Sequence, residues 1–429
     1  MSTSKPLTLK SNFSWTFVGN AIYAACQWGM LVVLAKFGSP EMVGTFTLGL
    51  AITAPIFMFS NLQLRHIQAT DAKQQYLFSD YLGLRLISTA LAFGLVVAIA
   101  MVASYSGEVS LTIILVGLAK SFESISDVFY GLIQQHERMD RIAISLMIKG
   151  PLSLIMMGLG IYLSGEILWG MIGLVISWGI VAIAFDLRSG KFILRNSSSA
   201  RLRENSSFRG NDQIQPTWNL NTIKQLTWLA LPLGFVMLLI SLNTNIPRYF
   251  IEEYLGAREL GFFAALAYLM VSGSMVVNAL GQSASPRLAK YYAAGNVKAF
   301  RQLLMQLVII AVGLGGLAII VAIVAGAEVL TLFYQPEYAQ YADLFVWLMV
   351  AAGISYISYF LGYGMTAARY FQIQMPLFTL ATAASAATSF WLIPRLGLKG
   401  AAIALITGAV VESVFSLGVI FHAIYRIKR

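Results

Sequence analysis

The chain has 429 residues, of which 58% are hydrophobic and 11% are charged, and its mean hydropathy is +0.73. Soluble domains contain roughly 45–50% apolar and 25% charged residues, so this composition excludes a soluble protein and indicates a multi-pass membrane protein. A net charge of +10 would suggest nucleic-acid binding in a soluble chain. Membrane topology explains the charge better here, and no nucleic-acid partner is expected.

Twelve membrane-spanning helices are predicted, because each crossing needs about twenty predominantly apolar residues. They lie near residues 12–35, 44–63, 81–104, 110–133, 142–163, 167–186, 224–247, 259–282, 302–326, 343–366, 374–393 and 400–424. Lys5 and Lys10 precede the first span without a small-residue cleavage signal, so we expect an uncleaved chain with its amino terminus inside. The outer segments then hold five basic residues, namely Lys36, Arg248, Arg258, Arg395 and Lys399. This asymmetry predicts a cytoplasmic-membrane protein with both termini in the cytoplasm.

The first two spans carry polar residues that a lipid-facing helix would avoid. Gln27 lies in the first span, and Asn61 and Arg65 lie at the inner end of the second. We expect these side chains to face protein or a water-filled space. Arg65 either neutralises a phosphate at an inner portal or serves as a topogenic charge among the lipid headgroups.

The fourth span, 110–133, has one polar face in an otherwise apolar helix. At about 100° per residue, the polar residues of this span and its inner end fall within an arc of roughly 80°. These residues are Lys120, Glu123, Asp127, Tyr130 and Gln134. Charges at bilayer depth are costly unless they are paired or hydrated. We therefore expect this face to line a protein interior or an aqueous cavity, where Glu123 and Asp127 either couple transport to an ion or form a structural ion-pair network.

Between residues 187 and 223 the hydropathy falls and the composition changes to Ser, Asn, Arg and Gln. The basic residues of this tract are Arg188, Lys191, Arg195, Arg201, Arg203 and Arg209. Such a composition predicts a flexible cytoplasmic linker that lies on anionic membrane lipid.

The second half of the chain also contains buried polar residues. Asn245 and Arg248 lie with Ser241 on one face of the seventh span, by i, i+4, i+7 spacing. Asn278 lies in the eighth span and Glu412 in the twelfth. Glu412 is a lone acid, whose simplest role is to pair with a helix hydroxyl.

Cysteine and histidine give no sign of a metal site. Cys26 is the single cysteine and lies in an apolar run, which excludes a disulfide within the chain. His66, His136 and His422 are scattered without metal-ligand spacing. No cofactor is expected, apart from H⁺ or Na⁺ as a coupling ion.

An internal repeat relates the two halves of the chain. Residues 37–42, Phe-Gly-Ser-Pro-Glu-Met, resemble residues 255–260, Leu-Gly-Ala-Arg-Glu-Leu, and each segment forms the outer turn between the first two spans of a half. Further matched pairs flank these turns: Gly44 and Gly261, Phe46 and Phe263, Asn61 and Asn278, Gln27 and Asn245. The halves are therefore expected to be duplicated bundles.

Six spans per half place both halves in the same orientation, so we predict two lobes related by a pseudo-two-fold axis along the membrane normal. The predicted domains are an amino-terminal lobe at 1–186, a basic cytoplasmic linker at 187–223 and a carboxy-terminal lobe at 224–429. Two bundles with polar inner faces suit a transporter that works by alternating access.

The chain resembles the polysaccharide transporter family of the multidrug/oligosaccharidyl-lipid/polysaccharide (MOP) exporter superfamily, which includes Wzx-like flippases. The segments that carry the resemblance are Asn20-Ala21-Ile22-Tyr23, residues 34–41 (Leu-Ala-Lys-Phe-Gly-Ser-Pro-Glu), Asn61-Leu62-Gln63-Leu64-Arg65, residues 79–85 (Ser-Asp-Tyr-Leu-Gly-Leu-Arg), Tyr254-Leu255-Gly256 and Ser285-Pro286-Arg287-Leu288. They are loose patterns spread over most of the chain, without an invariant catalytic signature.

The resemblance implies a membrane flippase, not an enzyme, that moves undecaprenyl-pyrophosphate-linked units of O-antigen, capsule or exopolysaccharide. It also implies contact with other polysaccharide-assembly proteins. The lumenal residues expected to bind substrate are Lys120, Arg248, Arg65, Asn245, Gln27, Asn61 and Asn278. The residues expected to couple ions or form ion pairs are Glu123, Asp127 and Glu412.

Two other functions compete with this one. A multidrug exporter of the same superfamily would share the spans and the carboxylates, and would confer dye resistance. A membrane glycan polymerase or ligase generally presents its catalytic residues on a long outer loop, whereas the longest hydrophilic tract here, 187–223, is predicted to lie inside.

Overall fold

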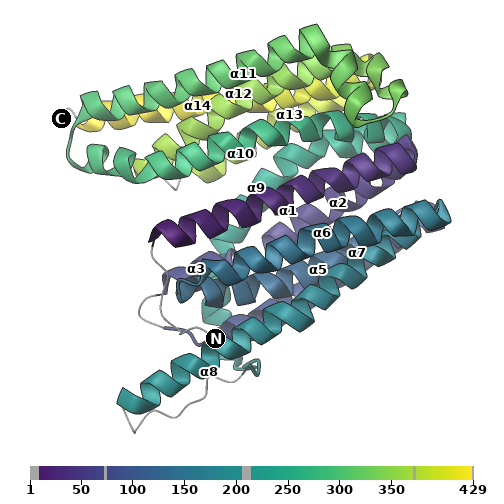
Figure 1. Cartoon of the computed structure of the whole chain (residues 1–429). Helices are drawn as coiled ribbons and strands as arrows, with labels where there is room; N and C mark the ends of the chain where they lie inside the picture. The colour runs from purple at the N-terminus through teal and green to yellow at the C-terminus, as the bar shows by residue number, and fades with distance from the viewer. Residues whose placement is uncertain (1–8, 72–74, 205–213, 371–372, 428–429) are drawn as a thin grey trace. The chain divides into compact units, whose positions relative to one another are not determined.

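The structure is a computed structural model that describes residues 9–71, 75–204, 214–370 and 373–427. Every regular element in these ranges is a helix (Figure 1). The elements are α1 (Leu9–Phe37), α2 (Pro40–Ser60), α3 (Leu64–Thr70), α4 (Phe78–Val102), α5 (Gly107–Gln135), α6 (Met139–Ser164), α7 (Ile167–Val181), the π-helix η1 (Ala182–Asp186), α8 (Leu187–Glu204), α9 (Leu220–Leu255), α10 (Ala257–Ala293), α11 (Val297–Phe333), the 3₁₀-helix η2 (Pro336–Tyr341), α12 (Ala342–Ala367), α13 (Gln374–Leu396) and α14 (Leu398–Ile427). In the described part of the chain, 12 helices are long and apolar enough to cross a membrane. The predicted all-α fold with twelve spans is confirmed.

The chain divides into two compact units. Unit 1 comprises Met1–Gly38 and Ile52–Leu238, and unit 2 comprises Ser39–Ala51 and Leu239–Arg429. The unit boundary therefore falls within two continuous helices, α2 and α9. The lobe boundaries expected from the repeat stay a prediction.

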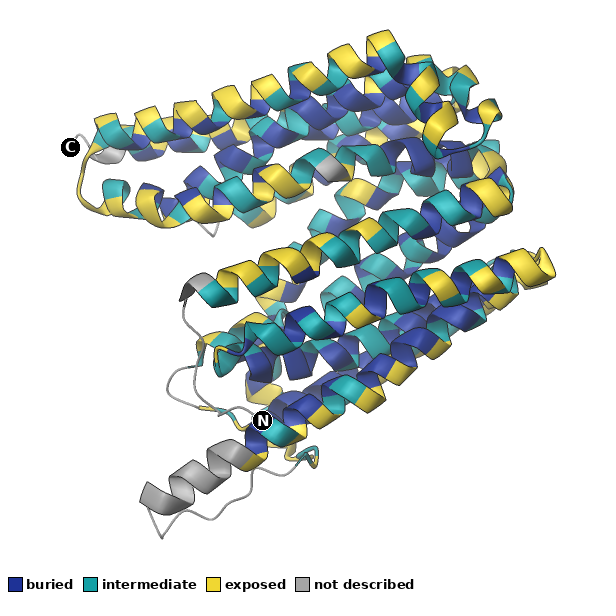
Figure 2. Cartoon of the chain, in the orientation of Figure 1, coloured by how far each residue is buried: buried dark blue, intermediate teal, exposed yellow. Residues whose placement is uncertain are grey.

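Unit 1 is built on α5, which packs against α4 and α7, while α6 packs against α1 and α7. One of its hydrophobic cores includes Leu64, Tyr81, Phe129 and Ile133. Figure 2 shows the buried residues as dark stripes along these helices. The polar face of α5 thus lies among other helices of unit 1.

Unit 2 is built on α12, which packs against α10, α11 and α14, and these helices run side by side in Figure 1. Phe300, Leu304, Phe360 and Met365 belong to its core. At 1.5 Å per residue, α10 and α11 are each about 55 Å long, because each has 37 residues. They exceed the roughly 30 Å hydrocarbon core of a bilayer.

The start of α2 and the start of α10 cross closely inside unit 2. A β-carbon on Gly44 would overlap the backbone carbonyl of Ala257, the first residue of α10, and one on Gly261 would overlap that of Pro40, the first residue of α2. Each glycine of this repeat-matched pair therefore lies against the first residue of the other helix. Close approach of two helix backbones is what small residues permit in membrane proteins.

A second contact joins α2 to α9. Pro55 lies inside α2 and has no N–H, so it cannot donate to the carbonyl of Ala51 four residues earlier. The hydroxyl of Tyr249 donates a hydrogen bond to that carbonyl. A buried acceptor that the proline would leave unpaired is thus satisfied by a neighbouring helix.

The beginning of the basic tract is helical, which differs from the flexible linker that its composition predicted. Helix α8 continues from α7 and η1 and packs against α5. Ile193 and Leu194 are buried, whereas Arg188 and Lys191 are exposed. The segment is helical because its few apolar residues share one face and bury it against the core of unit 1. Residues 205–213 lie outside the described part.

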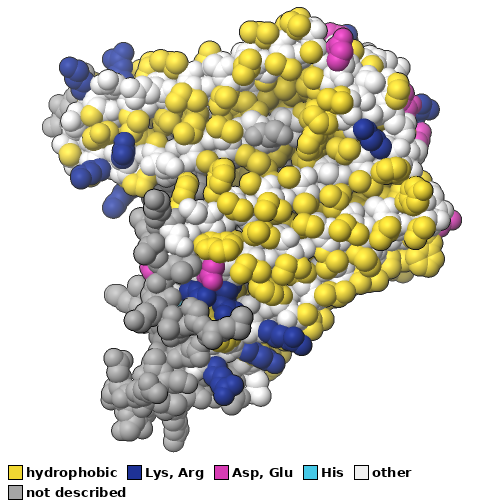
Figure 3. Space-filling model, in the orientation of Figure 1, with side chains coloured by type: hydrophobic (Ala, Val, Ile, Leu, Met, Phe, Trp, Pro, Cys, Tyr) yellow, Lys and Arg dark blue, Asp and Glu magenta, His cyan; other side chains and the backbone are white. Residues whose placement is uncertain are grey.

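The outer faces of the helices are apolar. On the face seen in Figure 3, hydrophobic side chains cover the sides of the helices, and Lys and Arg gather at their ends. Leu163, Val102 and Val324 are among the large apolar residues that are strongly exposed. Such a surface suits contact with lipid, because soluble monomers rarely expose large apolar areas.

Candidate functional site

Two groups of polar residues lie among the spanning helices, one in each unit. The first is a cluster in unit 1, called here the unit-1 polar cluster. It comprises Tyr23, Asn61, Arg65, Arg85, Lys120, Glu123, Asp127, Tyr130, Gln134, Ser145, Lys149, Trp178 and Asp186. The second lines a pocket within unit 2, called here the unit-2 pocket.

Glu123 forms the middle of the unit-1 polar cluster. Its carboxylate accepts hydrogen bonds from Lys120 at 2.7 Å and from Tyr23 of α1 at 3.1 Å. The Lys120 ammonium also lies 5.3 Å from the centroid of the Trp178 ring. The i, i+3 spacing on α5 brings Lys120 and Glu123 together, as the polar face predicted.

Asp127, one turn further along α5, is shared by two arginines. Arg85 of α4 donates to it at 3.1 Å and also donates to Asn61, whereas Arg65 lies 3.6 Å away. Arg65 in turn donates to Gln134 at 3.0 Å. The Arg85 side chain is 0% exposed, while those of Arg65 and Asp127 are each 27% exposed. Arg85 is thus the buried partner, and Arg65 is the one that reaches water.

Lys149 and Asp186 form the deepest part of the cluster, and sequence reasoning did not single them out. Ser145 donates to Asp186 at 2.6 Å, so the 2.7 Å contact of Ser145 with Tyr130 is donated by the tyrosine. The Lys149 ammonium lies 5.4 Å from the centroid of the Tyr130 ring and interacts electrostatically with Asp186 and Glu123. Lys149 is 1% exposed and Asp186 is 0% exposed.

The unit-1 polar cluster carries more positive than negative groups. Its cations are Arg65, Arg85, Lys120 and Lys149, and its carboxylates are those of Glu123, Asp127 and Asp186. With all groups ionised, four positive charges face three negative ones. Because charges interact strongly where water is scarce, the excess favours an anionic ligand.

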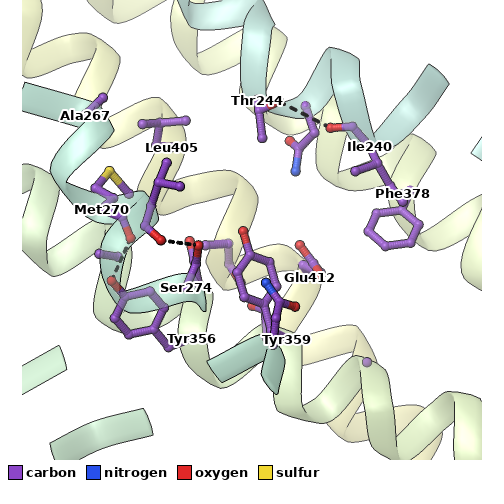
Figure 4. Close-up of a pocket in the computed structure, with 18 of the residues that line it drawn as sticks. Ile240, Thr244, Ala267, Met270, Ser274, Tyr356, Tyr359, Phe378, Leu405 and Glu412 are labelled. Atoms are coloured by element: carbon purple, nitrogen blue, oxygen red, sulfur yellow. Dashed lines mark hydrogen bonds between the residues drawn. The ribbon is translucent and has the colours of Figure 1, made fainter. Parts of the chain in front are cut away.

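The unit-2 pocket has a volume of about 410 Å³ and is lined by residues of α9, α10, α12, α13 and α14 (Figure 4). Phe263 and Asn278, which line its two ends, are 15 positions apart on α10, which is about 22 Å of helix. The pocket is therefore elongated along the helices. Its volume falls within the roughly 300–1,000 Å³ of small-molecule sites.

Arg248 lies at the Phe263 end of the pocket. It donates to Asn245 at 2.9 Å, and Asn245 donates to the carbonyl of Ser241 at 2.8 Å, so the predicted polar face of α9 orients the guanidinium. The Arg248 Nε atom is buried without a hydrogen-bond partner. Among the described residues no carboxylate lies within 4.0 Å of this guanidinium.

Several hydroxyl groups of the pocket wall donate hydrogen bonds to backbone carbonyls. Ser274 donates to Val271, Ser355 to Ala351 and Tyr356 to Met270, each at 2.7 to 2.8 Å. A hydroxyl that has donated its proton keeps lone pairs to accept with. These three hydroxyls therefore offer acceptors to a ligand, as Figure 4 shows for Tyr356 and Ser274.

Glu412 lines the pocket beside Tyr359, with which it interacts electrostatically (Figure 4). Its carboxylate adds another acceptor. At the other end, the Tyr363 hydroxyl donates to Asn278 at 3.3 Å. The two ends of the pocket thus differ, since one carries a cation and the other carries neutral groups.

The structure groups most of the sequence-predicted site residues. Asn61, Arg65, Lys120, Glu123 and Asp127 belong to the unit-1 polar cluster. Arg248, Asn278 and Glu412 line the unit-2 pocket, and Asn245 holds Arg248. Gln27 is separate from these contacts, and its Nε2 atom is buried without a hydrogen-bond partner. Their part in transport stays a prediction.

Family and relative comparisons agree on one class of protein. The sequence model of the family described as "Polysaccharide biosynthesis protein" matches residues 9–292, and that of the family described as "MatE" matches residues 232–371. The capsular polysaccharide biosynthesis protein CapF of Staphylococcus aureus is 30% identical over 396 residues, which cover 92% of this chain and 94% of CapF.

Solved structures share the fold at low sequence identity. An inward-facing multidrug resistance MATE family transporter of the MOP superfamily is 14% identical, with a TM-score of 0.67 over 96% of this chain and 98% of that chain. A MATE transporter of Vibrio cholerae is 15% identical, with a TM-score of 0.64 over 97% of both chains. A MOP superfamily transporter of Pyrococcus furiosus is also 15% identical, with a TM-score of 0.60 over 96% of this chain and 94% of that chain.

Proposed function

The chain belongs to the polysaccharide biosynthesis protein family, and from this premise we propose that it is a flippase for lipid-linked oligosaccharides. It is a multi-pass membrane transporter of the MOP superfamily with a part in polysaccharide biosynthesis. The proposed cargo is the undecaprenyl-pyrophosphate-linked repeat unit of an O-antigen, capsule or exopolysaccharide. Family and fold favour this transport role over a membrane glycan polymerase or ligase.

The physical task of such a flippase is to move a polar headgroup through hydrocarbon. A sugar chain with a pyrophosphate cannot leave water without compensating contacts, because each unpaired polar group costs several kcal/mol. The prenyl tail can stay in lipid while the headgroup passes along polar helix faces. Alternating access would expose those faces to each side in turn.

The observation that supports this proposal most is the excess positive charge of the unit-1 polar cluster. Among the four cations of the cluster, Arg65 and Lys120 have partly exposed side chains, at 27% and 24%. They can reach a phosphate while Arg85 and Lys149 remain buried behind them. Arginine and lysine are the side chains that bind phosphate most strongly.

Ion coupling is proposed for the carboxylates. Glu123 and Asp127 are partly exposed, at 33% and 27%, and Glu412 lines the unit-2 pocket. A carboxylate at such depth can take up H⁺ or Na⁺ when its cationic partner is drawn away by a substrate phosphate. Exchange of an ion for the anionic headgroup would couple the movement of H⁺ or Na⁺ to the movement of the substrate.

The proposed location is the cytoplasmic membrane, with both termini in the cytoplasm. The small number of basic residues in the expected outer segments supports this orientation. Contact with other polysaccharide-assembly proteins is part of the same proposal, because the repeat unit is made on one side of the membrane and used on the other.

Deletion and complementation test the transport function. Loss of the gene should abolish surface polysaccharide and leave lipid-linked repeat units inside. Lys120→Ala, Glu123→Gln and Asp127→Asn should each restore less surface polysaccharide than wild type at matched protein levels. Full restoration by all three variants would refute the role given to this cluster, and unchanged surface polysaccharide after deletion would refute the flippase itself.

A multidrug exporter is the second candidate, and the match of residues 232–371 to the MatE family supports it. An exporter would bind hydrophobic cations through carboxylates such as Glu412. Resistance of the deletion strain to dyes distinguishes the two. A strain that becomes dye-sensitive with normal surface polysaccharide would favour drug export.

A further inference from the structure

We propose that the unit-2 pocket binds an acidic sugar residue of the transported repeat unit, with the sugar's anionic group on Arg248. This inference rests on the proposed flippase function and assigns a ligand class to one site. Three features of the pocket support it: the hydrogen-bonding character of the wall, the Arg248 Nε atom that has no hydrogen-bond partner among the described residues, and the distance between the two ends.

The wall is suited to a ligand with many hydroxyl donors. The hydroxyls of Ser274, Ser355 and Tyr356 each donate a hydrogen bond to a backbone carbonyl. Their oxygens can therefore accept hydrogen bonds from a ligand. Glu412 accepts as well. A sugar supplies several O–H donors from one rigid ring, whereas a hydrophobic cation supplies few and would leave these acceptors without hydrogen bonds from the ligand.

Aromatic rings provide the apolar part of the same surface. Tyr356, Tyr359 and Tyr363 lie at positions i, i+3 and i+7 of α12, and all three line the pocket. An aromatic side chain with a polar tip combines an apolar face with a hydrogen-bonding group. The apolar C–H face of a pyranose can pack on such rings while its hydroxyls reach the acceptors.

Arg248 gives the pocket its selectivity for charge. It is a cation in the pocket wall that has no carboxylate partner among the described residues, and its Nε atom is buried and has no hydrogen-bond partner there. Asn245 fixes its position through a 2.9 Å hydrogen bond. A carboxylate or phosphate of the ligand would supply the missing acceptor, and the charge-assisted hydrogen bonds would be the strongest in the pocket.

The position of Arg248 favours a carboxylate on the sugar over the pyrophosphate of the lipid. Under the proposed topology, the turn between α9 and α10 is outer, and Asn278, Thr366 and Gln374 line the inner end of the pocket. The lipid pyrophosphate starts at the inner leaflet, near these neutral groups. Arg248 lies on the order of 20 Å further along the helices, where a sugar remote from the lipid would arrive.

A single reporter cysteine tests the assignment on the purified full-length chain. Cys26 is the native cysteine, so a Cys26→Ser background with Gly362→Cys places one thiol in the pocket. Gly362 lines the pocket, and a β-carbon there meets no atom within 4 Å. The rate of its modification by a small thiol reagent is measured on the chain reconstituted in lipid vesicles, with glucuronate, with glucose as the neutral match, and with undecaprenyl pyrophosphate in the vesicle membrane. Glucuronate should slow the reaction at concentrations at least about ten-fold lower than glucose, and undecaprenyl pyrophosphate should not slow it, because its pyrophosphate is held at the membrane surface.

Arg248→Gln should weaken protection by glucuronate about ten-fold or more and leave protection by glucose unchanged. Arg248→Lys, which keeps the charge but loses the guanidinium geometry, should fall between the two. Arg301→Gln, at an exposed position of α11 outside the pocket, is the matched control and should behave as wild type. The comparison of ligands on the reporter protein that keeps Arg248 tests the proposal even if an Arg248 variant does not fold.

Three results would overturn the inference. Protection by undecaprenyl pyrophosphate that Arg248→Gln removes would assign the guanidinium to the lipid phosphate. Protection by glucose equal to that by glucuronate would remove the role of charge, and protection by a hydrophobic cation but by neither sugar would assign the pocket to drugs. The assay requires no transport. If the chain fails complementation but glucuronate still protects the thiol, the flippase function is refuted and the ligand assignment stands.

Discussion

The hydroxyl of Tyr249 donates a hydrogen bond to the backbone carbonyl of Ala51, an acceptor that Pro55 leaves without its usual partner in α2. The contact ties α9 to α2 at a point where the proline interrupts the hydrogen-bond ladder. It shows that the interruption is compensated by a side chain from a different part of the sequence.

Tyr249→Phe removes this donor and should destabilise the protein. An unsatisfied buried carbonyl costs about 1–3 kcal/mol, so the melting temperature of the purified protein should fall measurably. Pro55→Ala restores an N–H that can serve Ala51 from within α2. The double variant should therefore lose less stability than Tyr249→Phe alone, and a strictly additive result would contradict the role given to this hydrogen bond.

Gly261→Ala and Gly44→Ala should both impair the crossing of α2 and α10. Each added methyl group would meet a backbone carbonyl of the other helix, and overpacking typically costs 1–3 kcal/mol. Gly313→Ala on α11 is the control, because a β-carbon there meets no atom within 4 Å. Thermal unfolding in detergent measures all three, and equal melting temperatures for Gly261→Ala and Gly313→Ala would refute the close crossing.

Lys149→Met should be among the most destabilising single substitutions in unit 1. It leaves the fully buried Asp186 without its main cationic neighbour, and breaking a buried charge pair costs about 3–5 kcal/mol. Asp186→Asn should be similarly costly. Combining the two changes removes both charges, so the double variant should be more stable than either single variant. A thermodynamic cycle built from the four proteins gives the coupling energy, which should be well above zero.

Asp127→Asn should destabilise the protein more than Arg65→Gln. Removing the Asp127 charge leaves Arg85, which is 0% exposed, without a counter-charge, whereas Arg65 is 27% exposed and lies 3.6 Å from Asp127. The first change should cost several kcal/mol and the second less than about 1 kcal/mol. Chemical or thermal unfolding of both variants checks this order, and the reverse order would mean that Arg65 is the principal partner.

Much of the fold could be predicted from the sequence, because hydropathy fixes the spans of a membrane protein. All twelve spans are present as helices. The polar face of α5 could also be predicted, because helical periodicity alone places Lys120 beside Glu123. The contacts confirm that geometry.

The partners of that face could not be predicted, because they come from other helices. Arg85 of α4 and Tyr23 of α1 reach α5 only through tertiary packing. Lys149 was a visible signal, since it is a charge within the apolar run predicted as the fifth span. The proximity of Lys149 to Asp186 could not be predicted, because no sequence pattern links α6 to η1.

Composition also misled in one tract. Residues 187–204 are rich in Ser, Arg and Asn, yet they form α8, because Ile193 and Leu194 bury a narrow apolar face. The repeat predicted that Gly44 and Gly261 are equivalent, but equivalence does not imply contact. Their meeting at a helix crossing is information that only the structure supplies.

The passage of α2 and α9 from one unit into the other has a mechanical consequence. Neither helix is interrupted by a loop at the boundary, at Ala51–Ile52 and Leu238–Leu239. Any displacement of one unit would therefore have to bend two continuous helices. In α2 the bend is expected at Pro55, because proline interrupts the hydrogen bonds of the helix there.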